Sequence, residues 1–324
     1  MSTLMSNLEI LIQHDSTVYQ VVVEEGVEWE SERKGSPGKL TFTVLNDSTL
    51  TFEEGDAVRM SVDDTNIFYG FVFQKNRDKA GKIKVTVYDQ LRYFKNKDTY
   101  TYTNKTASQV LKMLASDFLL NTGTIEDTEY VIASRAESNQ TLFDIMQNAL
   151  DLELENKKEM YVLYDDFGKI CLKNLERMKI GLVINEDTGE NYDYTSSIDS
   201  DTYNKIKLTY DNEDTGKREV YISKDTSNIN KWGILQYYDT IDEDTNGSSK
   251  ADALLELYNK KTRNLKITNA LGDVRVRGGS MVIVELELDD VTVQNWMIVE
   301  KVTHTFKNKE HLMDLTLRGG EFVA

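Results

Sequence analysis

The chain has 324 residues, of which 40% are hydrophobic and 29% are charged, a balance that is ordinary for a folded globular protein. No run of about eighteen apolar residues occurs, which excludes a membrane-spanning helix and predicts a protein without a membrane anchor. The net charge of −17 disfavours tight general binding to nucleic acid, and the single Cys171 excludes an internal disulfide framework. The first seven residues lack the basic and apolar regions of a signal peptide, so we expect folding in a reducing cytoplasm.

The first 95 residues predict a small β-barrel or sandwich. Short β-branched or alternating segments are separated by polar turns, and the alternation at 39–44 predicts a strand with one buried face. The predicted strands are residues 8–12, 18–23, 27–32, 39–44, 55–60, 67–73 and 82–88. We therefore expect an N-terminal β-barrel domain at residues 1–95.

Strand 67–73 carries aromatic residues on both faces. Period two places Ile67, Tyr69, Phe71 and Phe73 on one face, and Phe68, Gly70 and Val72 on the other. We expect a strand that is covered on both sides, by the barrel core and by a neighbouring domain or subunit. Phe71 is the residue expected to test whether its face is the core.

Residues 96–199 predict an α+β domain with two helices and a hairpin. Thr106 and Gln109 have the spacing of a capping box, ahead of an apolar helical stripe that we expect to end at 121–123. A second amphipathic helix is expected at 140–152. The segments 160–164 and 169–172 flank a polar turn, as in a β-hairpin.

Residues 200–324 predict a second β-barrel-like domain with one helix. Strands are expected at 203–210 and 217–223, and further strands between 265 and 317. A helix is expected at 249–263, with a buried stripe through Ala251, Leu254, Leu255 and Tyr258. Lys260, Lys261 and Arg263 suit the negative end of its dipole.

The β pattern near the N-terminus recurs near the C-terminus. Gly55 and Gly279 each open a strand, and an acidic turn (63–64 or 289–290), a second apolar strand, a polar turn and a third strand follow. Order and spacing predict a duplicated unit, although any two β-meanders share part of this pattern. The expected fold class is mainly β with an inserted α+β unit: two similar small β-barrel domains per chain plus smaller decorating domains. Three copies of such a chain would present six similar surfaces.

Three short patterns are related to known chemistry, but none predicts a site. Residues 242–247 match the start of an EF-hand loop, yet position twelve is Ala253 instead of the bidentate Glu. The triplet at 166–168 matches a kinase metal-binding motif without its companion motifs, so a hairpin is favoured. His304 and His311 lie near the two sides of a predicted turn and lack a third ligand for zinc. We therefore nominate no catalytic residue, no cofactor-binding residue, no metal ligand and no cofactor.

Basic residues cluster locally in this acidic chain, at 275 and 277 and again at 301, 307 and 309. We expect them to face acidic neighbours at subunit or partner interfaces, because an unpaired basic patch would attract DNA.

An ordered set of segments resembles the XkdQ/YqbQ tail proteins of PBSX-like phage elements. Glu28-Trp29-Glu30 opens the set, and Tyr88-Asp89-Gln90-Leu91-Arg92-Tyr93 is among its longer motifs. The other matching segments are residues 35–43, 55–58, 67–73, 104–107, 142–145, 160–168, 203–204, 232–233, 271–273 and 276–279. Each motif is short, but the set covers nearly the whole chain in order.

The resemblance implies a structural baseplate hub protein of a contractile phage tail or phage-tail-like particle, and not an enzyme. Such hubs are trimeric rings with two barrels per subunit, which join the six-fold tail tube to the three-fold central spike. The implied partners are two further copies of the chain, the tail tube protein, the central spike protein, a tape-measure or LysM-type tail protein and baseplate wedge proteins. DNA would pass without specific binding. The protein would be assembled in the bacterial host cytoplasm and reside in the baseplate of a virion, prophage particle or tailocin.

Two other function classes remain open. A tail-associated cell-wall hydrolase would require a cleft with convergent carboxylates or a metal. A receptor-binding adhesin would require exposed aromatic loops. A cell-wall zymogram separates the first class, and a cell-binding assay separates the second.

Overall fold

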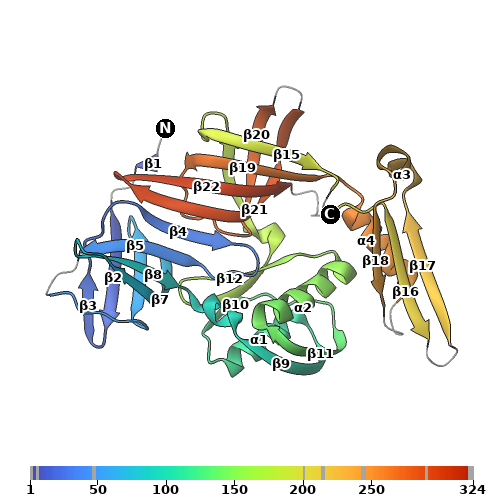
Figure 1. The fold of residues 1–324 in the computed structure, drawn as a ribbon, viewed down its shortest axis with the longest axis horizontal. Coiled ribbons are helices and arrows are strands. Elements are labelled where there is room, and N and C mark those ends of the chain that lie inside the picture. The colour runs from blue at the N-terminus through green and yellow to red at the C-terminus, as the bar shows by residue number, and fades with distance from the viewer. Residues whose placement is uncertain are drawn as a thin grey trace.

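The structure, a computed structural model, describes residues 3–4, 7–45, 49–199, 201–212, 216–241, 246–288 and 291–319. Its main feature is one sheet of 14 strands, with three smaller sheets beside it (Figure 1). The prediction of a mainly β fold is confirmed. The two predicted barrels are not confirmed. The described strands of both predicted barrels belong to this one sheet, which is open.

The first part of the large sheet is formed by strands before residue 89. Its central strands follow the order β4-β5-β8-β7-β6, and β2 and β3 extend it beyond β6. Side chains at alternate positions, including Phe42, Val58 and Val85, form its core. The bounds are β2 Leu8–His14, β3 Thr17–Gln20, β4 Val27–Glu32, β5 Lys39–Leu45, β6 Ala57–Val62, β7 Thr65–Arg77 and β8 Lys82–Tyr88.

The second part of the large sheet has a separate core, which includes Ile267, Val284 and Leu315. Its strands follow the order β15-β19-β22-β21-β20; β14 pairs with β20 and β1 with β22. The bounds are β1 Thr3–Leu4, β14 Lys179–Asn185, β15 Asn191–Ser197, β19 Thr262–Leu271, β20 Met281–Leu288, β21 Val291–Lys307 and β22 Glu310–Gly319.

The two parts are copies of one unit, which we call the first repeat (β4 to β8) and the second repeat (β15 and β19 to β22). In both, the long middle strand contains a bulge, at Phe73 in β7 and at Glu300 in β21. The Gly55 N–H donates to the Val72 carbonyl at 2.8 Å, and the Gly279 N–H donates to the Val299 carbonyl at 2.7 Å. The predicted duplication is therefore confirmed in strand order and in register.

The α+β unit follows the first repeat and packs below the large sheet in Figure 1. Thr106 forms the predicted capping box with Gln109. A second capping box, in which the Thr141 hydroxyl and the Asp144 carboxylate each accept a backbone N–H of the other, begins the longer helix. The bounds are η1 Gln90–Lys95, β9 Lys97–Lys105, α1 Ala107–Asp117, β10 Thr122–Ile125, β11 Ile132–Thr141, α2 Leu142–Lys157, β12 Tyr161–Asp165, β13 Ile170–Asn174 and η2 Leu175–Met178.

Two predicted helix ends in this unit are wrong. Helix α1 ends at Asp117, and the left-handed residue Leu119 (φ 54°) turns the chain, so that Thr122–Ile125 form β10 instead of a helix end. Helix α2 starts at Leu142, after the cap, and continues to Lys157. The predicted hairpin is confirmed as β12 and β13.

A further unit is inserted between β15 and β19 and lies at one end of the molecule (Figure 1). The predicted helix at 249–263 is too long, because α4 ends at Tyr258 and Thr262 already begins β19. Lys260 and Lys261 follow the helix, and Arg263 lies in the strand. The bounds are β16 Lys205–Asn212, β17 Lys217–Lys224, α3 Thr226–Trp232, β18 Gln236–Thr240 and α4 Gly247–Tyr258.

Strands β14 and β15 precede residue 200 but lie in the sheet of the second repeat. The sheet of that repeat therefore begins before the boundary predicted at 199/200. The division into independently folding domains at 1–95, 96–199 and 200–324 remains a prediction.

Candidate functional site

The contact between the two repeats brings together several charged pairs and two buried histidines. Strand β21 extends beyond β20, so the edge of its second half is free to accept another strand. Strand β4 occupies this edge, with Lys301 opposite Glu32 and Phe306 opposite Val27. We call this pairing of β4 with β21 the repeat junction.

Charged pairs hold one face of the repeat junction. The Arg33 guanidinium donates to both oxygens of Glu300, at 2.9 and 2.8 Å, and is almost fully buried. Lys301 Nζ lies 2.8 Å from a Glu30 oxygen and 3.0 Å from a Glu32 oxygen. A bidentate, buried Arg–carboxylate pair constrains geometry more than an exposed ion pair does. These contacts therefore define the register of β4 on β21.

Two histidines form the opposite face. The His304 ring stacks on Trp29 at 4.4 Å, and the His311 ring stacks on Phe306 at 4.4 Å. His304 Nε2 lies 2.9 Å from the Val276 carbonyl, and His304 Nδ1 lies 2.9 Å from His311 Nε2. A carbonyl only accepts, so His304 carries its hydrogen on Nε2 and accepts at Nδ1 from the His311 Nε2–H.

Both histidines are held neutral. Burial, together with the neighbouring His311, lowers the pKa of His304 to about 3. Burial also lowers the pKa of His311 to about 4. No group of three or more potential metal ligands occurs among the residues that the structure describes. The pair that was predicted to lie near one turn thus meets directly, as a packed and hydrogen-bonded part of the repeat junction.

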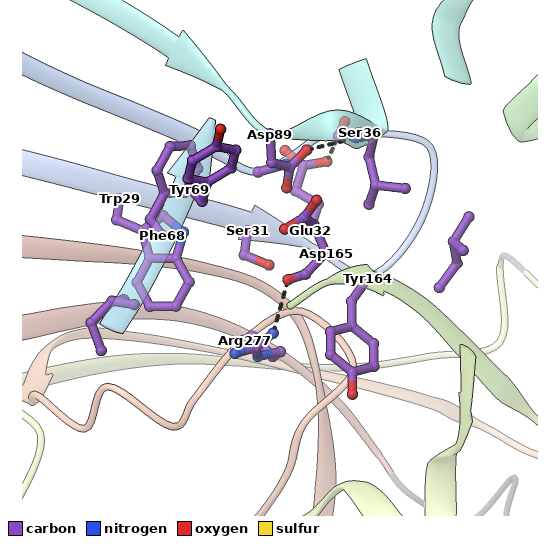
Figure 2. A pocket seen from close by; sticks show the side chains of 14 residues that line it. Trp29, Ser31, Glu32, Ser36, Phe68, Tyr69, Asp89, Tyr164, Asp165 and Arg277 are labelled. Atoms are coloured by element: carbon purple, nitrogen blue, oxygen red, sulfur yellow. Dashed lines mark hydrogen bonds between the residues drawn. The ribbon is translucent and has the colours of Figure 1, made fainter. Parts of the chain in front are cut away.

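A small pocket lies next to the repeat junction, where both repeats meet the α+β unit (Figure 2). Asp89 follows β8, Asp165 ends β12 and Arg277 precedes β20. The Arg277 Nη1 donates to the Asp165 carbonyl at 3.0 Å, and the guanidinium carbon lies 4.9 Å from the centre of the Tyr164 ring. Arg277 therefore links the second repeat to the α+β unit.

The two carboxyl groups of the pocket have raised pKa values. Burial raises the pKa of Asp89 well above its usual value, and the charge of Asp165 adds to the effect. Burial raises the pKa of Asp165 to about 6. Asp89 accepts hydrogen bonds from the Gly38 and Leu91 backbone N–H groups at 2.8 and 3.0 Å. Asp165 Oδ1 accepts from the Gly168 N–H at 2.6 Å, whereas its buried Oδ2 has no partner.

This pair of carboxyls meets one requirement of a hydrolase, which is a perturbed pKa. The space in the pocket is about 20 Å³, enough for about one water, whereas small-molecule sites usually span about 300–1,000 Å³. Asp89 is also engaged with backbone N–H groups from two segments. The geometry therefore describes a joint between three parts of the chain, with no room for a sugar ring.

The remaining motifs from the sequence lie in turns, in ion pairs within the chain, or outside the described residues. The triplet at 166–168 forms the hairpin turn, and Phe167 packs against Tyr69. Residues 242–245 of the EF-hand-like stretch and the acidic turn at 289–290 lie outside the described residues. Arg275 pairs with Asp273 in the same chain, and Arg277 lies 3.6 Å from Asp166.

Strand β7 is covered on both sides, as expected, but its core face is the one opposite Phe71. Phe68 and Val72 are buried in the first core, whereas Phe71 is half-buried and packs edge-on against Tyr69. Gly168 of the α+β unit approaches the Tyr69 ring so closely that a Cβ there would lie 2.5 Å from it. The outer face is therefore covered by the α+β unit.

The model of the YQBQ-like family matches residues 27–318. The chain belongs to this family. This YQBQ-like chain is 29% identical over 320 residues to the phage-like element PBSX protein XkdQ of Bacillus subtilis (strain 168), covering 95% of this chain and 96% of the relative. That relative is named as a protein of a phage-like element. No helix in the described part is long and apolar enough to cross a membrane.

Two solved structures have a similar fold. The 43 kDa tail protein of prophage MuSo2 from Shewanella oneidensis superposes with a TM-score of 0.70 at 11% identity, covering 98% of this chain and all of that chain (100%). The E. coli c3393 protein superposes with a TM-score of 0.56 at 12% identity, covering 95% of this chain and 76% of that chain. That protein is described as a component of the type VI secretion system with structural similarity to the T4 tail proteins gp27 and gp5.

Proposed function

We propose that this YQBQ-like protein is a structural hub of a tail baseplate, in which three copies form a ring between the six-fold tail tube and the three-fold central spike. The observation that carries the proposal is the duplication with conserved register. A chain with two equivalent units supplies six equivalent positions from three copies, which suits a connector between these two symmetries. The fold likeness to a protein that resembles gp27 and gp5 supports the same role.

The proposed partners follow from that role. They are the tube protein on one side of the ring and the spike on the other, with tape-measure or LysM-type and wedge proteins around it. The proposed location is the baseplate of a contractile virion, prophage particle or tailocin that is assembled in the host cytoplasm. We propose no catalytic function, because the pocket with perturbed carboxyls holds about one water.

Native mass spectrometry tests the proposal, on the chain alone and after mixing with the central spike protein of the same particle. The expected species is a closed trimer, at least in the mixture. A stable dimer or hexamer of the chain in the spike complex would contradict the hub role. A cell-wall zymogram of the full chain should show no clearing, and clearing that is lost in Asp165→Asn would favour a hydrolase instead.

A further inference from the structure

The two repeats have equivalent edges, but only one of the two junctions that these edges allow is made within the chain. In the repeat junction, β4 of the first repeat occupies the free edge of β21. The equivalent of β4 in the second repeat is β15, which has β19 as its only partner among the described strands. The equivalent of β21 is β7, whose pairing with β6 ends at Phe71 while the strand continues to Arg77.

We propose that β15 of one copy pairs with residues 74–77 of β7 in a second copy, and so repeats the repeat junction between chains. We call this pairing the subunit junction. The inference rests on the proposed function, because it names the contact through which copies of the chain would join. The occupant of both free edges is another copy of the same chain.

The register of the repeat junction predicts which residues would face each other in the subunit junction. The bulges make Phe73 equivalent to Glu300, so Gln74, Lys75 and Asn76 correspond to 301, 302 and 303. The pairing of β15 with β19 makes Thr195, Ser196 and Ser197 correspond to 30, 31 and 32 of β4. In the repeat junction 301 faces 32 and 303 faces 30. The subunit junction therefore places Gln74 opposite Ser197 and Asn76 opposite Thr195.

Burial differs between the two repeats in the way that a missing strand predicts. Val27 and Trp29 of β4 are 1% and 4% exposed where β21 covers them. Their equivalents in β15 are Tyr192, which is 45% exposed, and Tyr194, which is half-buried. An uncovered edge strand with exposed aromatic side chains is a ready site for strand addition.

The side chains also fit across the subunit junction. Arg77 corresponds to His304 and would lie opposite Tyr194, the equivalent of Trp29. A guanidinium over the tyrosine ring would replace the stacked histidine and tryptophan. Gln74, Asn76 and Thr195 are all exposed and polar, so their pairing leaves no buried charge without a partner.

The contact is heterologous, because β15 and β7 are different edges. Each added copy therefore presents a new free edge, and the series ends only when a ring closes. Closure after three copies would place six repeats in one ring, with repeat junctions and subunit junctions alternating. The molecule would then have no unpaired edge of this kind, which reduces the hazard of uncontrolled strand addition.

Paired cysteines test the register. Asn76→Cys with Thr195→Cys in one full-length chain places two cysteines opposite each other across the subunit junction, where facing Cβ atoms lie about 4.5–5.5 Å apart. The matched control is Asn76→Cys with Asn191→Cys, which displaces one cysteine by four residues, or about 13 Å along the strand. The native Cys171 is buried and remains in both variants.

Mild oxidation of the assembled protein, alone and with the spike protein, is followed by non-reducing electrophoresis. The expected result is covalent dimers and trimers for the facing pair, and monomers for the displaced pair and for each single cysteine. An oligomer in native mass spectrometry that gives no cross-link, equal cross-linking of the displaced pair, or a chain that stays monomeric with the spike protein would each overturn the inference. Cross-linked species that continue beyond trimers would support the subunit junction and contradict the trimeric hub, so the two failures are distinguishable.

Discussion

At the scale of single residues, the repeat junction depends on groups whose protonation is controlled by burial. The Val276 carbonyl accepts a hydrogen bond, so His304 must carry its hydrogen on Nε2. His304 Nδ1 then accepts, so His311 must carry its hydrogen on Nε2. Protonation of either ring would place a charge between stacked aromatic rings. The pKa values of about 3 and 4 express the cost of that charge.

The pH dependence of stability should show this cost. The folded pKa values lie below the unfolded value of about 6.5, so the unfolded chain binds more protons and stability falls as the pH drops below about 6.5. At pH 5 each histidine should lower the free energy of unfolding by about 2 kcal/mol, because this pH lies about 1.5 units below the pKa of a histidine in the unfolded chain. Chemical denaturation should therefore show that His311→Gln loses about 2 kcal/mol less than the unmodified chain between pH 7.5 and pH 5.

Asp165→Asn is a control for which the expected change in the pH dependence of stability has the opposite sign. The pKa of Asp165 is raised to about 6, so the folded chain binds the extra proton and gains stability as the pH falls through 6. Removing this carboxyl should make the loss between pH 7.5 and pH 5 larger. An identical pH profile for the unmodified chain and His311→Gln would contradict the buried neutral pair.

Sequence patterns located these residues only in part. The spacing of 304 and 311 around a turn indicated that the two histidines could meet, because residues near a hairpin turn face each other across the strands. Arg33, Glu300, Asp89 and Asp165 gave no comparable signal, since their partners lie far away in the sequence. A chain with 55 acidic residues does not reveal which of them are buried.

At the scale of elements, β7 shows the limit of period-two patterns. Alternation separated Phe68 and Val72 from Phe71 correctly, but it was wrong for Ile67, which lies at a bulge and is buried in the same core as Phe68. Aromatic residues on both faces also left the core face undecided. The deciding factor is the α+β unit, which covers Tyr69 from outside. Packing between segments that are distant in the chain cannot be predicted from the local pattern of residues.

Phe68→Ala should therefore be more damaging than Phe71→Ala. Phe68 is 3% exposed in the first core, and its loss should cost about 3–5 kcal/mol of unfolding free energy. Phe71 is half-buried, and its loss should cost clearly less. Urea denaturation of the two variants side by side measures the difference, and the reverse order would mean that the two faces are misassigned.

Gly278, which precedes β20, packs against the backbone at the end of β4 and leaves no space for a side chain. A Cβ on Gly278 would lie 2.3 Å from the Glu32 carbonyl carbon and 2.5 Å from the Arg33 nitrogen, so the backbone of β4 would have to move. Gly278→Ala should therefore cost about 1–3 kcal/mol through overpacking.

Gly181→Ala is the matched control for this substitution. Nothing lies within 4 Å of a Cβ built on Gly181, so we expect a change within about 0.5 kcal/mol. The measurement is thermal or chemical unfolding of both variants. Equal stability of the two would show that β4 and the loop before β20 are less closely packed than the structure indicates.

At the scale of the whole molecule, the acidic charge and the pairing of basic residues bear on DNA. The chain carries a net charge of −17, and Arg275, Arg277 and Lys301 all lie against acidic groups of the same chain. These three cations are therefore poorly placed to neutralise phosphates. This agrees with a ring through which DNA would pass without being held.

The assembled protein should show no retention of duplex DNA at physiological salt in a gel-shift assay. Arg275→Gln is the test variant, because Arg275 is largely exposed beside Asp273. The variant should behave like the unmodified chain. Retention by the unmodified chain that disappears in Arg275→Gln would place this residue on a DNA-facing surface.

The inserted unit leaves and rejoins the second repeat at one place. Ser197 and Thr262 face each other across the β15–β19 ladder, so everything between them starts and ends at adjacent points. The first repeat spans the same place with the short turn at 33–38. Replacing residues 198–261 should therefore leave the rungs of the β15–β19 ladder in place, at the cost of contacts such as the Lys250–Glu155 ion pair between α4 and α2. In a closed ring of three chains, exchanging this segment would alter every second position on the rim and leave the sheet that joins the copies unchanged.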